Sequence, residues 1–124
     1  MLDSAKIMTF VPTRDPKMAK GFYQGILGLH LMSEDSFAVV FDAHGIMLRV
    51  TNVREFKPNP FTILGWEVPD IGKATADLRE RGVSFERYDG MKQDSIGIWT
   101  ASDGAKIAWF KDPDGNVLSI TEFA

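Results

Sequence analysis

The segment VPTRDPKMAKGFYQGILGL, residues 11–29, contains the end of a strand, the capped start of a helix and the residues that end the helix. Asp15 is a good N-cap, since its carboxylate can accept a hydrogen bond from an amide of the first turn, and Pro16 suits the first helical position. Gly25 and Gly28 end the helix. Apolar side chains recur between Pro16 and Gly28 at three- and four-residue steps, which predicts that one face of the helix is buried: Met18, Ala19, Phe22, Tyr23 and Ile26.

Short strands are predicted on both sides of this helix. One precedes it at residues 6–11, and the stretches after it are β-prone and separated by turn residues: residues 30–33, 37–42 and 46–51. The order then starts again with a strand at 61–68, which also ends in Val-Pro, and with a helix capped by Asp70. Further strands follow around the turns Ser102–Gly104 and Asp112–Gly115: residues 83–88, 96–101, 105–111 and 117–123.

The repeat predicts an α+β fold with two βαβββ modules. We expect a single domain over residues 1–124, made of modules 5–52 and 61–124 and joined by a polar, proline-bearing linker at 53–60. Neither half of so short a repeat can bury its sheet face alone, so the two modules are expected to pair.

Composition narrows the classes of function. A net charge of −3 argues against nucleic acid as a partner. The chain has no cysteine, which excludes a disulfide scaffold, a thiolate metal site and a cysteine nucleophile, and fits a cytoplasmic protein. The opening residues lack a signal-peptide pattern, and no apolar run reaches the length of a membrane span, so no membrane partner is expected.

Three motifs point to a known family. The first joins VPTRD (11–15) to FY (22–23) and ILGL (26–29), the second joins WEVPDI (66–71) to Gly82-Val83, and the third is FKDPDGN (110–116). In this order and spacing they resemble the vicinal-oxygen-chelate superfamily, which includes glyoxalase I, extradiol dioxygenases, fosfomycin-resistance enzymes and bleomycin-resistance proteins. The resemblance covers nearly the whole chain. It implies a concave groove formed by the strands and a homodimer.

The resemblance also implies where a metal would be held. The family's ligands, typically His with Glu or Gln, correspond here to Met8, Ile63 and Ser119, and to either Leu48 or Arg49, because the register of that strand is open by one residue. These side chains are not a ligand set for Zn, Ni, Mn or Fe(II). We therefore expect no metal and no cofactor. Glu122 lies three residues from Ser119 and is expected on the other face of its strand.

Structural roles are expected for the remaining histidine and aspartate candidates. The only histidines, His30 and His44, are expected at the surface or in loops. A rebuilt metal site would need one of them with a nearby carboxylate: Glu34, Asp42 or Asp89. The Asp112 and Asp114 side chains are expected to bond their own turn amides rather than calcium.

The groove is expected to be apolar. Phe10 shares the parity of Met8, Phe61 that of Ile63 and Phe123 that of Ser119, whereas Trp66 alternates away and is expected in the core. The predicted ligand-binding residues are Met8, Phe10, Leu48, Ile63, Trp99, Trp109 and Ser119. Candidates for polar contacts at the rim are Arg49, Glu67, Tyr88 and Asp89. The alternative is that the apolar residues simply fill the core.

These features lead to two hypotheses of function. The first is a metal-free protein that holds an apolar or aromatic small molecule, as bleomycin-resistance proteins do. The second is a glyoxalase- or dioxygenase-type enzyme with a displaced or non-metal active site. The sequence does not identify catalytic residues or decide whether the chain is an enzyme.

Overall fold

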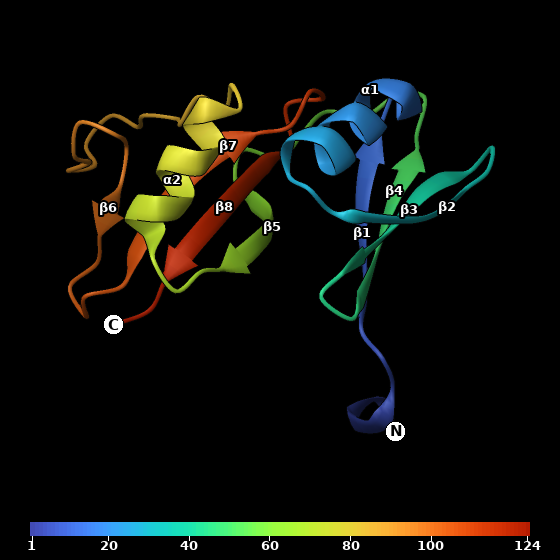
Figure 1. The fold of residues 1–124 in the computed structure, drawn as a ribbon, viewed down its shortest axis with the longest axis horizontal. Helices are drawn as coiled ribbons and strands as arrows, with labels where there is room; N and C mark the ends of the chain where they lie inside the picture. The colour runs from blue at the N-terminus through green and yellow to red at the C-terminus, as the bar shows by residue number, and fades with distance from the viewer. The chain divides into compact units, whose positions relative to one another are not determined.

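The first unit of the computed structural model covers residues 1–57, and the second covers residues 58–124, so that every residue of the chain is described. The division falls inside the segment that the sequence predicts as a linker. Figure 1 colours the first unit from blue to green and the second from green to red.

The first unit contains one sheet and one helix. Its elements are a 3-10 turn (Leu2–Ser4), β1 (Met8–Thr13), α1 (Pro16–Lys20), a π-helical segment (Gly21–Ile26), β2 (His30–Glu34), β3 (Ala38–Ala43) and β4 (Ile46–Asn52). The predicted cap is confirmed, because Asp15 accepts a 3.1 Å hydrogen bond from the amide of Met18. The predicted helix to Ile26 is present, but its second half is wound as a π-helix.

The second unit repeats this plan. Its elements are β5 (Thr62–Glu67), α2 (Ile71–Glu80), β6 (Trp99–Thr100), β7 (Lys106–Lys111) and β8 (Val117–Glu122). Asp70 caps α2 by accepting a 3.0 Å hydrogen bond from the amide of Lys73. Neither α1 nor α2 has the length and apolar character that a membrane crossing requires.

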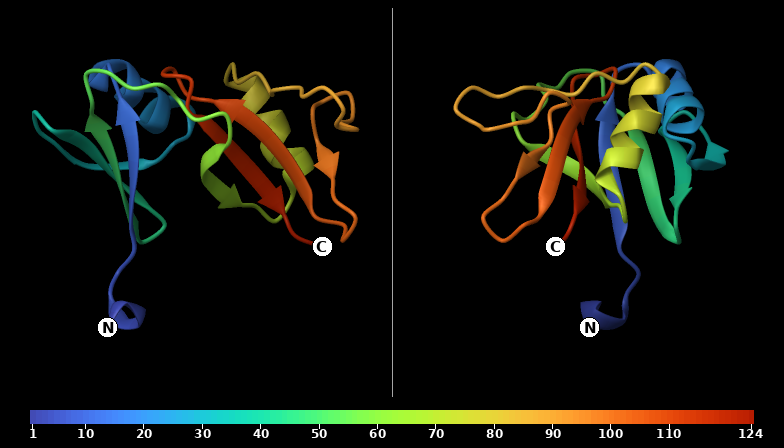
Figure 2. Two further views of the ribbon diagram at one scale, coloured as in Figure 1. Left: turned by 180° about the vertical axis from the view of Figure 1, so that it is seen from behind. Right: turned by 60° about the vertical axis from the view of Figure 1, so that its left-hand side comes forward.

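Strand order confirms the two βαβββ modules. The sheets have the orders β1-β4-β3-β2 and β5-β8-β7-β6. In each sheet the first strand of the unit runs parallel to the last, and the other pairs are antiparallel. Figure 2 shows each helix against one face of its own sheet. Each sheet therefore has a helix-covered face and a second face, which we call the open face.

The helix-covered faces hold the two cores. In the first unit the fully or nearly fully buried apolar side chains include Val11, Val39, Phe41, Leu48 and Val50, with Ala19 and Tyr23 from the helical segments. In the second they include Ala108, Phe110, Leu118 and Ile120, with Ile71 from α2. Trp66 lies on the helix-covered face as predicted and stacks on the buried Phe110 at 6.5 Å between ring centroids, but it is itself only half-buried.

One predicted strand is absent. Residues 83–88 form a single bridge from Phe85 to Phe110 rather than a strand. The reason is that side chains take the place of a ladder. Gln93 accepts a 2.8 Å hydrogen bond from the amide of Tyr88 and donates to the carbonyls of Glu86 and Gly97 at 2.9 and 2.8 Å. The amide of Glu86 still donates a 2.8 Å hydrogen bond to the carbonyl of Trp109 on β7. The contacts of Gln93 satisfy neighbouring backbone groups within the loop.

The hairpin after this loop is shorter than predicted. Its first arm is only Trp99–Thr100, because the carboxylate of Asp94 accepts hydrogen bonds from the amides of Ile96, Gly97 and Ile98, each at 2.9 Å. The turn at Gly104 is as expected, with a φ of +92° that suits glycine.

Candidate functional site: the open faces of the two sheets

The open face of the first sheet is built from two adjacent rows of side chains. Register places Met8, Met47, Asp42 and His30 in one row and Phe10, Arg49, Val40 and Ser33 in the next. Side chains alternate along a strand, so members of both rows leave the sheet on the side away from α1. Phe10 is 60% exposed and Met8 46%, in contrast to the buried helix-covered face.

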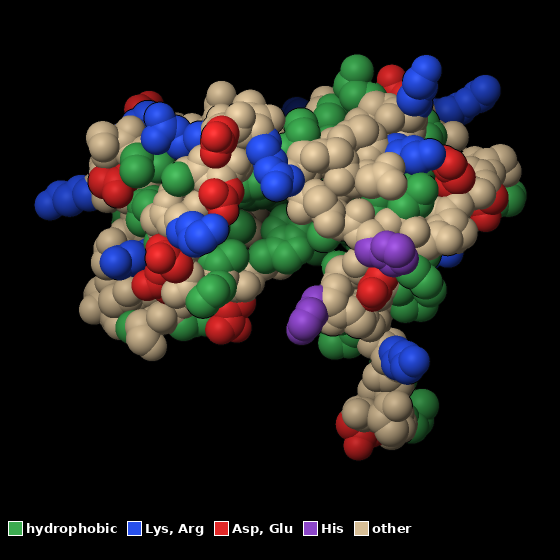
Figure 3. Space-filling model, viewed as in Figure 1, with side chains coloured by type: hydrophobic (Ala, Val, Ile, Leu, Met, Phe, Trp, Pro, Cys, Tyr) green, Lys and Arg blue, Asp and Glu red, His purple; other side chains and the backbone are tan.

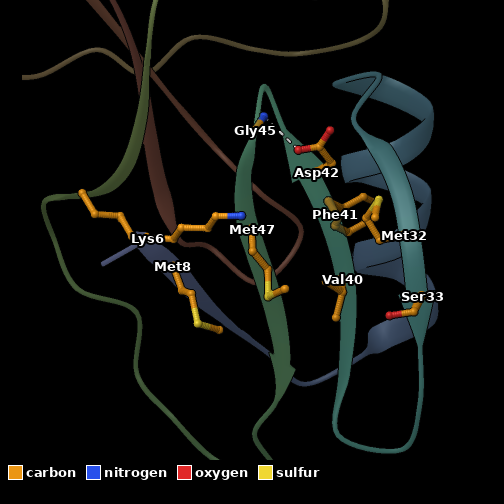
Figure 4. A pocket seen from close by; sticks show the side chains of 10 residues that line it. Lys6, Met8, Met32, Ser33, Val40, Phe41, Asp42, Gly45 and Met47 are labelled. Carbon is orange, nitrogen blue, oxygen red and sulfur yellow. Dashed lines mark hydrogen bonds between the residues drawn. The ribbon is translucent and has the colours of Figure 1, made fainter. Parts of the chain in front are cut away.

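A pocket of about 530 Å³ opens on this face. Figure 4 shows methionine side chains from three strands around it: Met8, Met32 and Met47. Lys6 and Asp42 also line it, and Asp42 accepts a 2.8 Å hydrogen bond from the amide of Gly45. An apolar pocket with a few polar groups is the usual composition of a small-molecule site, and flexible thioethers adapt to ligands of different shape.

The open face of the second sheet carries an aromatic cluster. Trp109 pairs in register with Ser119, and Trp99 pairs with Ile107, which shares the face of Trp109. The ring centroids of Trp99 and Trp109 are 6.2 Å apart, and Tyr88 meets Trp109 edge-on at 5.6 Å. Burial is the largest cause that raises the pKa of Tyr88, with the charge of Glu86 adding to it and that of Lys111 opposing it.

Ser119 is the polar centre of the second open face. Only 7% of it is exposed, and Gly65 lies so close that a Cβ there would come within 3.0 Å of its hydroxyl oxygen. Ile63 lies half-buried at an irregularity of β5, where the pairing with β8 shifts between Thr62 and Leu64. Glu67 is exposed on this strand.

The structure corrects one predicted site residue. Leu48 is completely buried on the helix-covered face, in register with Phe41 and Thr9. The register choice left open by the sequence falls on Arg49, which shares the open face with Met8 and Phe10. The other predicted residues of the first unit, Met8 and Phe10, lie on its open face as expected.

Two pocket residues, Met47 and Met32, were not predicted from the sequence, for different reasons. Met47 follows from the corrected register, and the alternation of Leu48 and Val50 with Arg49 and Thr51 could have revealed it. Met32 occupies an irregularity between Leu31 and Ser33, where parity has no predictive value.

The side chains at the family's ligand positions do not fit a metal ion. Met8 offers a thioether, Ile63 a hydrocarbon, Ser119 a buried hydroxyl and Arg49 a fixed positive charge that would repel a cation. No group of three or more His, Cys, Asp and Glu side chains in the chain could hold a metal. His44 lies in the turn between β3 and β4 with a φ of +52°, and both histidines are exposed.

Asp112 and Glu122 have structural partners. Asp112 accepts hydrogen bonds from the amides of Asp114 and Asn116 at 3.0 and 2.9 Å, as expected for a turn. Glu122 lies on the helix-covered face and accepts from the amide of Ile71 at 2.9 Å, which confirms that it points away from Ser119.

Comparison with solved structures places this fold among known ones. TnmS3, an antibiotic binding protein from Streptomyces sp. CB03234, is 26% identical, with a TM-score of 0.73 over 100% of this chain and 99% of that one. A protein from Sphaerobacter thermophilus, described as a member of the glyoxalase/bleomycin resistance protein/dioxygenase superfamily, is 22% identical. Its TM-score is 0.75 over 98% of this chain and 99% of that one. Lactoylglutathione lyase from Agrobacterium tumefaciens is 16% identical, with a TM-score of 0.73 over 96% and 93%.

Sequence comparison gives the family. No curated protein matches the chain in sequence. The family model described as Glyoxalase/Bleomycin resistance protein/Dioxygenase superfamily matches residues 6–120, which is nearly the whole chain. With the repeated module, the strand order and the structural likeness, this match means that the chain belongs to the glyoxalase/bleomycin resistance protein/dioxygenase superfamily.

Proposed function

We propose that this chain is a metal-free small-molecule-binding protein of the cytoplasm that holds an apolar or aromatic ligand against an open sheet face. The observation that carries the proposal is the exposed apolar lining of the first unit's pocket, with Met8, Met32 and Met47 between 42% and 60% exposed. Figure 3 shows apolar side chains reaching the surface of this unit. Exposed apolar area gathered at one hollow is characteristic of a binding site.

The second unit supports the same proposal. Trp99, Trp109 and Tyr88 offer a polarisable surface beside the hydroxyl of Ser119, and aromatic rings bind apolar groups with a large contact area. The likeness to TnmS3, which is described as an antibiotic binding protein, gives the binding of a small molecule a precedent within this fold. The ligand-binding residues that we propose are Met8, Phe10, Ile63, Trp99, Trp109 and Ser119.

The absence of metal is part of the proposal. Its support is the donor set at Met8, Arg49, Ile63 and Ser119, which suits no divalent cation. We expect metal content per subunit to stay near zero in protein purified without chelator and then incubated with Ni, Zn, Mn or Fe(II). Stoichiometric metal would overturn this part and favour the glyoxalase- or dioxygenase-type enzyme.

Tryptophan fluorescence tests the binding proposal. The probes are doxorubicin, an aromatic molecule with an ammonium group, and 1-anilinonaphthalene-8-sulfonate, an aromatic molecule with a sulfonate group. Ligands of both charges are thereby tested, and calorimetry gives an independent measure of affinity. We expect at least one probe to cause a saturable fluorescence change. Trp109→Phe should reduce that change, whereas Trp66→Phe, which alters the other face of the same sheet, should leave it. If neither probe binds at millimolar concentration, that result would count heavily against the proposal.

We also propose that the chain forms a homodimer. The support is the family resemblance together with large apolar side chains that remain exposed outside the pocket: Phe37, Phe61 and Phe123. Sedimentation equilibrium should give twice the 13.8 kDa mass of the chain. A mass of one chain at all concentrations would contradict the dimer but not the binding function.

A further inference from the structure

The open face of the first sheet contains a guanidinium without a partner. Arg49 lies in the middle of β4, between Phe10 on β1 and Val40 on β3. It is half-buried, yet it forms no hydrogen bond and no ion pair with another residue. Its nitrogen atoms are not among the buried polar atoms that lack a partner, so the guanidinium is accessible from outside the sheet. A free and accessible guanidinium beside apolar side chains can receive an anionic group of a ligand.

No carboxylate forms an ion pair with Arg49, although the charge of Asp35 interacts with it. The pKa of Asp35 is lowered first by the amides of Phe37 and Ala38 and only to a lesser degree by the charge of Arg49. The oxygen Oδ1 of Asp35 accepts hydrogen bonds from those two amides at 2.8 and 3.0 Å. Asp35 is therefore already engaged in its own turn.

The row next to Arg49 on the open face is apolar at Met8 and Met47, and a second cation, Lys6, lies beyond that row. Both methionines line the pocket, and the rows along a strand are about 7 Å apart, within reach of an arginine side chain. Lys6 also lines the pocket and makes no ion pair. Two free cations thus lie beside an apolar surface, where Asp42 is the one carboxylate of the lining.

A polar atom on the same strand is also unsatisfied. The hydroxyl of Thr51 is buried and has no hydrogen-bond partner. Thr51 lies two residues beyond Arg49 on β4 and shares its face. Buried polar groups in folded proteins are nearly always paired, so the polar side of this face is incomplete in the protein alone.

We propose that Arg49 is the anion anchor of the pocket, so that the ligand is an apolar or aromatic molecule bearing a carboxylate or a similar oxyanion. A guanidinium can hold a carboxylate through two parallel hydrogen bonds, while Phe10, Met8 and Met47 contact the apolar body. This inference rests on the proposed binding function. It runs against the overall charge of −3, because a contact in a partly buried site outweighs a weak, screened long-range field.

Two dyes that differ only by an anionic group test the proposal. The first is 1-anilinonaphthalene-8-sulfonate, and the second is N-phenyl-1-naphthylamine, which lacks the sulfonate. We expect Arg49→Met to lower the affinity for the sulfonate dye about tenfold, which is the effect of losing one charge-assisted contact. The affinity for the neutral dye should not change. Arg49→Lys should keep part of the affinity. Added salt should weaken only the sulfonate dye.

The matched control is Arg79→Met, which removes the same charge from the last turn of α2. This substitution should not change the affinity for either dye. Urea unfolding checks that all variants are folded. Equal loss of both dyes in Arg49→Met would mean that Arg49 only shapes the pocket, and unchanged binding of both would remove it from the site. Either result overturns the anchor but leaves the binding function standing. Failure of both dyes to bind the unaltered protein would overturn both proposals.

Discussion

The amide of Ile71 donates a 2.9 Å hydrogen bond to Oε1 of Glu122, 51 residues further along the chain. Ile71 is the first residue of α2, and Glu122 is the last residue of β8, so a strand carboxylate caps the helix that covers its sheet. The amides of a first helical turn have no partner within the helix, and their dipoles attract negative charge. This contact fixes α2 on the second sheet.

Loss of this cap is expected to destabilise the protein. Glu122→Ala should lower the free energy of unfolding by about 1–2 kcal/mol, and Glu122→Gln by less, because the amide oxygen can still accept the hydrogen bond. Urea unfolding measures both. Glu80→Ala, at the exposed far end of α2, is the control and should stay within about 0.5 kcal/mol of the unaltered protein. If Glu122→Ala and Glu80→Ala lowered the free energy of unfolding equally, Glu122 would not act as a helix cap.

The loop before Trp99 should respond to acid. Burial pushes the pKa of Asp94 upward, but hydrogen bonds from the amides of Ile98, Gly97 and Ile96 and the charge of Arg87 outweigh it, so the pKa is lowered. A group with a lowered folded pKa contributes stability above its unfolded pKa, about 3.9, and that stability is lost as the pH falls through the folded value.

Asp94→Asn should therefore flatten the fall in stability below about pH 4. The variant should already be less stable at pH 7, because a neutral amide is a weaker acceptor for the three amides. Urea midpoints measured from pH 3 to pH 7 check this. Asp77→Asn, on the exposed side of α2, is the control. If Asp94→Asn and the unaltered protein lose stability equally as the pH falls, Asp94 is not the group responsible for this loss.

The unsatisfied hydroxyl of Thr51 gives a prediction of opposite sign. Thr51→Val replaces a buried oxygen that lacks a partner with a methyl group of similar size, and should raise the free energy of unfolding by about 1 kcal/mol. Thr75→Val is the matched contrast. The hydroxyl of Thr75 donates to the carbonyl of Ile71 at 2.8 Å, so its loss should destabilise by about 1 kcal/mol. Thermal unfolding that gives both changes the same sign would contradict this reading.

The helix-covered half of the fold was predictable because its signals are local. Asp15 and Asp70 cap their helices as expected, and the apolar periodicity of each helix gives its buried face. The alternation in β4 was just as informative, but the prediction left the register open by one residue and included Leu48 among the ligand-binding residues. Leu48 and Val50 are the buried pair, so the polar Arg49 and Thr51 mark the other face.

The open faces were harder to predict for a physical reason. A binding surface is not covered by the chain itself, so its side chains need not follow the strict apolar alternation that burial imposes. Met32 shows this at an irregularity, where no periodicity applies. Tyr88 reaches Trp109 from a loop whose conformation depends on Gln93, a contact that spacing alone does not reveal.

Tyr88 supplies the last prediction, at high pH. Its pKa is raised, mainly by burial, so the folded protein keeps the phenolic proton where the unfolded chain has already lost it. Unfolding then releases a proton, and stability should fall as the pH rises past the ordinary tyrosine value of about 10.

Absorbance at the phenolate band can follow this ionisation directly, because the chain has only two tyrosines. We expect the Tyr88 signal, assigned by its loss in Tyr88→Phe, to titrate above pH 10, and the alkaline loss of stability to become shallower in that variant. Phenylalanine keeps the edge-on contact with Trp109, so the variant should remain folded at neutral pH. Titration of Tyr88 at or below the ordinary value would mean that the aromatic cluster on the second open face is more hydrated than its packing implies, and would weaken its case as an apolar binding surface.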